Sequence, residues 1–332
     1  MATIKDVSEK AGVSQATVSR VLNGSDKVVE STCEKVMAAV EALGYRPNTL
    51  ARAMASGRSG IVGMMVPELA SPVYSPLMGE AEALLRKHSK QLIVASGHCD
   101  PKLEREAIDF LLQCRCDALI LMAEAVSDEY LLDIAKANVE VVIVNRAVDG
   151  LESNCVSLDN IAGGKLATQF LIDAGHTHIG CITGPQFKPD ARDRQSGFLQ
   201  ALRDHEIAYS ADRITEGNYT EQSGYEGMKS LSSKGVSAVL CGNDEMAFGA
   251  IAYCRDHQIK VPEDVSIMGF DNLHFARYTY PALTTMHFPI DEMAISAAHL
   301  ILNRCYNIDP TAPITRRYQP NIVERQSVNK SA

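Results

Sequence analysis

The chain has no tryptophan, no long apolar run and no surplus of positive charge. Without about 18 consecutive apolar residues, no membrane-spanning helix is expected. The beginning of the chain lacks the apolar core of a signal peptide, so we expect a cytoplasmic protein. The 332 residues include 9 cysteines in no even framework. In a chain without an export signal, such cysteines are expected to be reduced and mostly buried.

Sequence motifs of catalysis and metal binding are also missing. The chain contains no nucleophile elbow, HExxH motif or paired-carboxylate pattern, so we predict neither an enzyme nor a cofactor. Cys114 and Cys116 lack a second cysteine pair for a zinc site and are interpreted as packing residues. Gly163-Gly-Lys165 lacks the full phosphate-loop spacing. His176 and His178 have the look of a metal-binding pair, but a structural role is expected for them.

The net negative charge of the chain arises outside the first 60 residues. Residues 1–60 carry 8 Lys/Arg and 6 Asp/Glu, and the remainder carries 24 and 35. This distribution suggests that only the head of the chain meets nucleic acid. The length predicts a small head with one or two larger lobes. Arg316 and Arg317 are interpreted as a solvated charge pair.

The first 23 residues predict two short helices around a tight turn. Val7 and Ala11 form one apolar side of the first helix, and Gly12 can adopt the left-handed conformation that ends it. Ser14 is expected to cap the second helix, which turns Val18, Val21 and Leu22 inward. A helix-turn-helix of this kind lays its second helix in the major groove of DNA.

The outer face of the second helix carries Gln15, Ala16, Thr17, Ser19 and Arg20. Arg20 can donate two hydrogen bonds to guanine, and Gln15 can pair in the same way with adenine. Ala16 offers only apolar contact, for example to a thymine methyl group. These residues are the predicted DNA contacts of the head.

A third helix and a short fourth helix are expected to follow. Ser31-Thr-Cys-Glu34 has the pattern of a capping box that opens the third helix, and Gly44 ends it. The apolar face of this helix is predicted to contain Val36, Met37, Val40 and Leu43. Residues 48–56 form a short helix that is marginal on its own, so we expect it to order only when something packs against it.

The segment from Thr3 to Ala55 resembles the DNA-binding head of the LacI/GalR family of bacterial transcriptional regulators. Two motifs carry the resemblance: Val13-Ser-x-x-Thr17-Val-Ser-Arg20-Val-Leu-Asn23 and Gly44-Tyr-Arg-Pro-Asn48-x-x-Ala51-Arg. It implies that Gln15, Ala16 and Arg20 contact bases. It also implies that Thr17, Ser19 and Asn23 hold phosphates.

The same resemblance implies that residues 48–56 are a hinge helix that forms on the operator. Two copies of the hinge would pair in the minor groove and insert an apolar side chain into a central base step. Most relatives have Leu at that position, and this chain has Met54. Leu50 and Ala51 belong to the same predicted contact with DNA.

From Ile61 onward, apolar strands alternate with helices in the pattern of a parallel sheet covered by helices. The expected strands are 61–66, 91–95, 118–122 and 141–144, then 179–183, 238–241 and 265–269. The expected helices are about 76–88, 103–113, 127–137, 161–174, 190–205, 221–233 and 244–257. The predicted fold is therefore an all-α helix-turn-helix head followed by an α/β body of two parallel-sheet lobes, with a ligand cleft between the lobes.

Residues 60–325 resemble the effector-binding core of the same family, which is similar to periplasmic sugar-binding proteins. Its markers include Gly175-His-x-x-Ile179-Gly, Asn243-Asp-x-Met-Ala247-x-Gly and Gly269-Phe-Asp271. The resemblance implies a head at 1–57 and a core at 60–332, with chain crossings near 157–161, 287–291 and 320–324. The expected N-lobe comprises about 60–159 and 291–321, and the expected C-lobe about 160–289 and 322–332.

The family resemblance also implies a set of effector contacts. Asp190, Arg194, Asn243 and Asp271 offer the paired donors and acceptors that a polyhydroxyl sugar needs. Aromatic cover for the sugar is expected from Tyr74, Tyr219 and Phe288. Several alternatives stay open at this stage. Arg194 and Asp271 can instead form a structural ion pair, Lys188 with Arg194 permits a phosphorylated sugar, and Asn272, where relatives have Asp, changes the charge of the pocket.

These observations predict a sequence-specific transcriptional regulator, most simply a repressor that acts as a homodimer on a pseudo-palindromic operator. A small sugar bound between the lobes is expected to control operator affinity. The C-terminus has no heptad extension, which favours a dimer over a tetramer. The alternative is an exported sugar-binding receptor without DNA function. A sugar-modifying enzyme is a remote third possibility. Within the family, the sequence is most similar to galactose or β-glucoside repressors.

Overall fold

The computed structural model describes residues 2–22, 27–45, 57–137 and 139–329. The chain divides into two compact units, Met1–Gly60 and Ile61–Ala332. Throughout the described ranges, no helix is both long and apolar enough to cross a membrane.

The first unit, the head, contains helices packed around one small apolar core. They are α1 (Ile4–Ala11), α2 (Gln15–Leu22) and α3 (Glu30–Leu43). The core residues are Val7, Val18, Val36 and Ala39. Gly12 ends α1 with a φ of 67°, and Gly44 ends α3 with a φ of 56°, so both glycines adopt the predicted left-handed conformation. The Ser14 hydroxyl accepts a hydrogen bond from the Thr17 N–H at 3.1 Å, which confirms the predicted cap of α2.

Two details of the head differ from the prediction. The capping box lies at Thr3 and Asp6, where the Asp6 carboxylate accepts from the Thr3 N–H at 2.7 Å. α3 begins at Glu30, one residue before Ser31, so Ser31 lies inside the helix and does not cap it. Met37 is 52% exposed and faces away from the core, where Ala39 packs instead.

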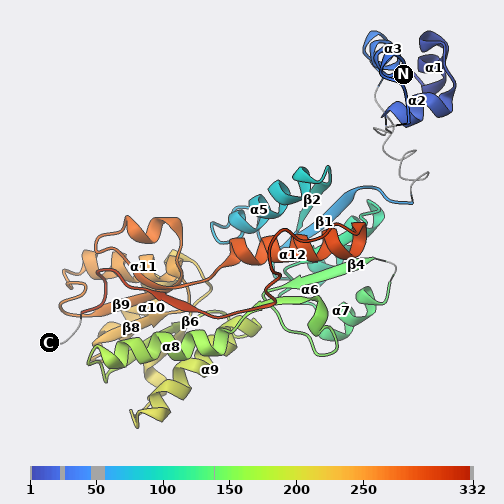
Figure 1. Ribbon diagram of the computed structural model, residues 1–332. Helices are drawn as coiled ribbons and strands as arrows, with labels where there is room; N and C mark the ends of the chain where they lie inside the picture. Colours follow the sequence, from blue (N-terminus) through green and yellow to red (C-terminus); the bar gives the residue numbers. More distant parts are fainter. Residues whose placement is uncertain (1, 23–26, 46–56, 138, 330–332) are drawn as a thin grey trace. The chain divides into compact units, whose positions relative to one another are not determined.

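The body consists of two six-stranded sheets, each flanked by helices on both faces (Figure 1). The strand order is β11-β5-β4-β3-β1-β2 in the N-lobe and β12-β10-β9-β8-β6-β7 in the C-lobe. The N-lobe strands are β1 (Ile61–Val66), β2 (Gln91–Ser96), β3 (Ala118–Leu121), β4 (Glu140–Val144), β5 (Cys155–Leu158) and β11 (Arg317–Tyr318). The C-lobe strands are β6 (Ile179–Thr183), β7 (Ile214–Glu216), β8 (Ala238–Cys241), β9 (Ser266–Asp271), β10 (Thr284–His287) and β12 (Asn321–Val323). The described pairings are parallel except that of β12 with β10, so the predicted fold class is confirmed.

Alternate residues of each strand contribute to different apolar layers. The helices are α5 (Tyr74–Lys87), α6 (Pro101–Gln113), α7 (Asp128–Ala135), α8 (Asn160–Asp173), α9 (Pro189–Asp204), α10 (Glu221–Ser232), α11 (Asp244–Asp256) and α12 (Ile290–Tyr306). In β1, Val62 and Met64 pack toward α5 and α12, while Met65 packs toward α6 and α7. In the C-lobe, one face of the sheet packs against α8 and α9 and the other against α10 and α11.

The chain passes between the two sheets at three places. It leaves β5 at Leu158 for α8, leaves β10 for α12, and leaves β11 for β12. Arg317 donates to the Asp159 carboxylate at 2.6 Å, which ties two of these crossing segments together. Arg317 is therefore not simply a solvated charge, as the sequence suggested, although its side chain is 68% exposed.

Close contacts between helices explain the glycines of α8 and α9. A Cβ on Gly164 would collide with the Arg194 carbonyl, and one on Gly197 would collide with the Ile161 carbonyl. The Gly163-Gly-Lys165 segment therefore lies inside α8 at a helix contact. His176 links Ser237 and Ser266, with 3.0 Å from each ring nitrogen to a serine hydroxyl.

Candidate functional site

The head presents a polar face on α2. Gln15, Ala16 and Arg20 are exposed, and Val18 on the opposite side is buried in the head core. Thr17 and Ser19 are partly exposed, and the Thr17 hydroxyl lies 2.9 Å from that of Ser14. The helix therefore has the predicted division into an inner and an outer face. Asn23, Leu50, Ala51 and Met54, the other predicted DNA contacts, lie outside the described residues.

The body contains a cavity of about 280 Å³ between the carboxyl ends of its two sheets, here called the interlobe cavity. Its size is near the lower end of the ~300–1,000 Å³ of known ligand pockets. All the predicted effector contacts lie in its wall. They are Tyr74, Asp190, Arg194, Tyr219, Asn243, Asp271 and Phe288. Open α/β sheets place their ligands at this edge.

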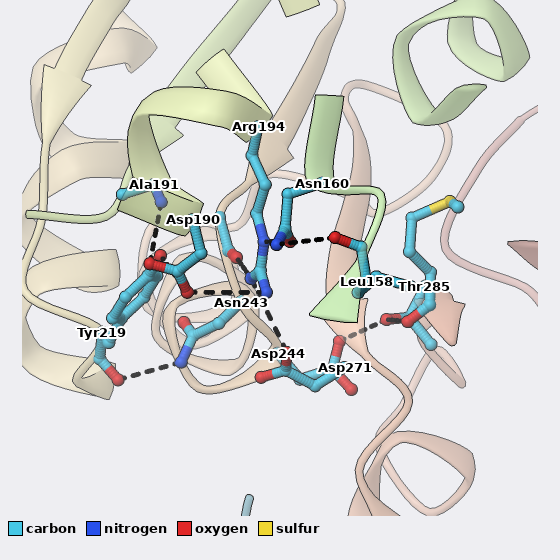
Figure 2. Close-up of polar contacts among 12 residues, drawn as sticks. Leu158, Asn160, Asp190, Ala191, Arg194, Tyr219, Asn243, Asp244, Asp271 and Thr285 are labelled. Carbon is cyan, nitrogen blue, oxygen red and sulfur yellow. Dashed lines mark hydrogen bonds and ion pairs between the residues drawn. The ribbon is translucent and has the colours of Figure 1, made fainter. Parts of the chain in front are cut away.

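Arg194 connects several segments at the floor of the cavity (Figure 2). Its Nε donates to Asn160 Oδ1 at 2.9 Å, and its Nη1 donates to the Gly242 carbonyl at 2.6 Å. The guanidinium lies 3.7 Å from the carboxylates of Asp190 and Asp271. Burial opposes the charge of Arg194, but Tyr219 and these two carboxylates raise its pKa overall. The donors of this arginine are thus largely committed within the protein.

Asn243 positions an aromatic side of the cavity. Its Oδ1 caps α11 by accepting from the Met246 N–H at 2.9 Å, and its Nδ2 donates to the Tyr219 carbonyl at 3.0 Å. Tyr219 has a φ of 68°, which is uncommon for a bulky residue. Its hydroxyl lies 3.5 Å from Asp190 Oδ2. This interaction holds the Tyr219 ring beside the Asp190 carboxylate.

Asp271 ends β9 in a strained conformation, with a φ of 120°. Asp244 supports the following loop, because its carboxylate accepts from the Leu273 N–H at 2.7 Å and from the Thr285 hydroxyl. Burial raises the pKa of Asp271 well above its ordinary value, and the pKa of Asp244 rises to about 7 for the same reason. Backbone strain of this type persists where the surroundings determine it and is frequent at functional sites.

The N-lobe wall contains residues that the sequence prediction did not include. Glu68, His98, Cys99 and Asn145 all line the cavity, and each follows the carboxyl end of an N-lobe strand. No motif marks these positions, but the expected location of ligands beyond strand ends was a usable signal. Both lobes therefore contribute polar groups to the cavity.

Lys188 is a buried cation of the C-lobe whose charge interacts with that of Glu124 in the N-lobe. It is only 6% exposed, and its Nζ lies 5.2 Å from the Tyr219 ring centre. Burial disfavours its charge, but Glu124, Tyr74 and Asp190 outweigh burial and raise its pKa. Burial also raises the pKa of Glu124 to about 7, against the opposing effect of Lys188.

The loop that carries Glu124 is held by a buried carboxylate. Glu104 in α6 accepts hydrogen bonds from the N–H groups of Glu124, Ala125 and Val126 at 2.8–3.1 Å. Asn272 differs from the expectation, because it is not among the residues that line the cavity. Its Oδ1 accepts from Arg325 Nη2 at 2.6 Å instead. Asn272 therefore does not line the cavity, and its expected effect on the charge of the pocket stays a prediction.

Comparisons with known proteins find matches for both units of the chain. Residues 3–48 match the model for bacterial regulatory proteins of the lacI family, and residues 168–328 match that for a periplasmic binding protein-like domain. The chain is 38% identical over 331 residues to the HTH-type transcriptional regulator GalR of Escherichia coli (strain K12), covering 99% of this chain and 96% of GalR.

Solved structures give the same result. The lac repressor dimer bound to operator and the anti-inducer ONPF matches with a TM-score of 0.87 and 25% identity, over 99% of each chain. A complex of the transcriptional regulator CelR with cellobiose matches with a TM-score of 0.71 and 29% identity, over 98% of this chain and 100% of that one.

Proposed function

Because this chain belongs to the LacI family of DNA-binding bacterial transcriptional regulators, we propose that it is a repressor whose affinity for its operator is controlled by an uncharged sugar in the interlobe cavity. The observation that carries the proposal is the cavity wall, where carboxylates, an amide and aromatic rings from two lobes meet. Adjacent sugar hydroxyls require paired donors and acceptors of this kind.

The few free donors of the cavity favour a neutral sugar over a phosphorylated one. Its lining includes the carboxyl groups of Glu68, Asp190, Glu245 and Asp271, and its cationic side chains are Lys188 and Arg194. Arg194 already donates to Asn160 and Gly242 and faces two carboxylates. A phosphate would therefore find few available donors.

Control of DNA binding is proposed to follow from a change in the arrangement of the lobes. A sugar that contacts both walls favours one relative orientation of the N-lobe and the C-lobe, which three crossing segments connect. In a homodimer, this change would alter the spacing of the two hinge segments and weaken their hold on a pseudo-palindromic operator. The coupling is reciprocal, so the operator would weaken sugar binding by the same factor. A regulator of chromosomal DNA would act in the cytoplasm.

Regulation is favoured over an exported receptor because the head matches a regulatory family. The relatives are likewise transcriptional regulators rather than enzymes, and we propose no catalytic role. Isothermal titration calorimetry with D-galactose and cellobiose, each compared with its 6-phosphate, tests the ligand class. The proposal predicts binding of at least one neutral sugar and at least tenfold weaker binding of its phosphate. Tighter binding of the phosphates would contradict it.

A further inference from the structure

The segment that follows β12 is fastened to the C-lobe by buried hydroxyl groups. Residues 324–329, here called the C-terminal segment, continue from the strand in which the third crossing between the lobes ends. Ser327 is fully buried, and its Oγ accepts from the Thr284 N–H at 2.8 Å. Further along, the Asn329 N–H donates to Ser266 Oγ at 2.9 Å. The docking of this segment therefore depends on few side chains, of which Ser266 is the last.

His176 lies beside Ser266, in the turn between α8 and β6. Its Nε2 lies 3.0 Å from Ser266 Oγ, and its Nδ1 lies 3.0 Å from Ser237 Oγ. Ser266 begins β9, and Ser237 directly precedes β8. The imidazole ring therefore connects the amino ends of two strands with the residue that holds Asn329.

The contacts of Ser266 determine which ring nitrogen of His176 carries the proton. Ser266 Oγ accepts from the Asn329 N–H and is fully buried, so its own proton needs an acceptor inside the protein. The acceptor within reach is His176 Nε2. Nδ1 then carries the ring proton and donates to Ser237 Oγ. This hydrogen-bond network requires a neutral imidazole.

We propose that neutral His176 anchors the C-terminal segment and that protonation of its Nε2 releases the end of this segment from the C-lobe. A proton on Nε2 would point at the Ser266 oxygen, which already accepts from Asn329, and the hydroxyl proton of Ser266 would lose its acceptor. A buried donor without an acceptor is costly. The inference does not depend on the sugar. It makes a segment at the end of a lobe crossing sensitive to pH.

The pKa of His176 has the direction that such an anchor requires. Burial lowers this pKa from its ordinary value, and the backbone of Asn329 opposes the effect of burial only in part. The titratable side chains on the turns and the segment that meet at the ring are His178, Lys234, Asp264, Glu324 and Arg325. None of these five groups contributes to the pKa of His176. Because the unfolded chain takes up the proton first, the anchor is complete above about pH 6.5 and is lost as pH falls below it.

Amide hydrogen exchange of the full chain, read by mass spectrometry at pH 7.5 and pH 5.5, measures the docking of the C-terminal segment. Protection factors are compared, because the intrinsic exchange rate itself changes with pH. Wild type should lose at least tenfold protection in this segment at pH 5.5. His176→Gln, whose amide oxygen stands in for Nε2 and does not titrate, should change by less than twofold. His178→Gln is the matched control, since His178 lies exposed two residues along the chain, and it should keep the wild-type loss.

Two outcomes of this experiment would overturn the proposal. The first is equal protection of the wild-type segment at both pH values. The second is the same loss in His176→Gln as in wild type. That result would assign the loss to Asp244, whose pKa of about 7 lies in this range and whose charge interacts with that of Arg325 in the segment.

Ser266→Ala provides a second variant, should His176→Gln not fold. It removes the hydroxyl that joins the ring to Asn329. The segment should then be poorly protected at both pH values, with at least a tenfold loss relative to wild type at pH 7.5. Wild-type protection of Ser266→Ala at pH 7.5 would contradict the anchor.

Discussion

Arg194 Nη1 lies 3.7 Å from Asp271 Oδ1, and both side chains are buried at the floor of the interlobe cavity (Figure 2). The two alternatives that the sequence left open for this pair are therefore compatible. The pair is a structural ion pair, and both of its members line the cavity. The guanidinium also stacks 3.7 Å from the centre of the Phe270 ring. The same contacts thus hold the C-lobe together and shape the site.

Replacing Arg194 should destabilise the body strongly. Arg194→Gln leaves the carboxylates of Asp190 and Asp271 buried without their cation, which typically costs about 3–5 kcal/mol. Urea unfolding at pH 7 measures the loss. Arg203→Gln is the control, because Arg203 lies exposed on the same helix, and a change within about 0.5 kcal/mol is expected there. Equal stability of the two variants would show that the Arg194 contacts contribute little.

Two helical glycines, one in a close helix contact and one exposed, should respond in opposite ways to substitution by alanine. Gly197→Ala would place a methyl group against the Ile161 carbonyl, and this overpacking should destabilise the protein by about 1–3 kcal/mol. Gly79 lies exposed in α5, where no described atom is within 4 Å of an added Cβ. Gly79→Ala should therefore stabilise by about 0.5–1 kcal/mol. Thermal unfolding of the two variants tests both signs, and a stabilised Gly197→Ala would refute the close approach.

The buried carboxyl of Glu124 predicts a pH dependence of stability. Because burial raises its pKa from 4.5 to about 7 in the folded protein, the folded state holds this proton more tightly than the unfolded chain. Its contribution is complete below about pH 4.5 and is lost as pH rises through 7, amounting to about 3 kcal/mol. Urea unfolding between pH 5 and 8 should show a smaller decline in Glu124→Gln than in wild type. Glu129→Gln, at an exposed site with a lowered pKa, should keep the wild-type decline.

The outer face of α2 predicts where operator specificity resides. Arg20→Ala should weaken operator binding by about 1–3 kcal/mol and relax the preference at one base position. Competition with operator variants at fixed salt measures both effects. Lys102→Ala is the control, since Lys102 is an exposed cation of the body. An equal loss in the two variants would indicate charge attraction without base contact.

The fold was largely predictable because hydrophobic pattern and motif agree along most of the chain. The buried strand Ile61–Val66 and the helix after it are clear from the pattern of apolar residues. α12 was not among the expected helices, although Asp291 and Glu292 in its first turn and Arg304 in its last turn are signals of helix ends. Short strands such as β7 and β11 offer too few residues for any period to show.

The candidate site was predictable on one side only. Asn243 and Asp271 stand in motifs, whereas His98 and Asn145 of the N-lobe wall follow strand ends without one. Their position depends on how two lobes meet, which local sequence does not encode. The capping box expected at Ser31 was wrong, because α3 already begins at Glu30 and its N-cap residue, Val29, has no side chain that can accept a hydrogen bond.

The most direct test of control by a sugar is a fluorescence-anisotropy titration of the full chain on DNA from the region upstream of its own gene. The titration is run at fixed salt, because salt alone changes such affinities by orders of magnitude. It is repeated with the neutral sugar that calorimetry shows to bind and with that sugar's 6-phosphate. The account predicts at least tenfold weaker operator binding with the neutral sugar and little change with the phosphate. Operator affinity that stays the same at saturating sugar would contradict it.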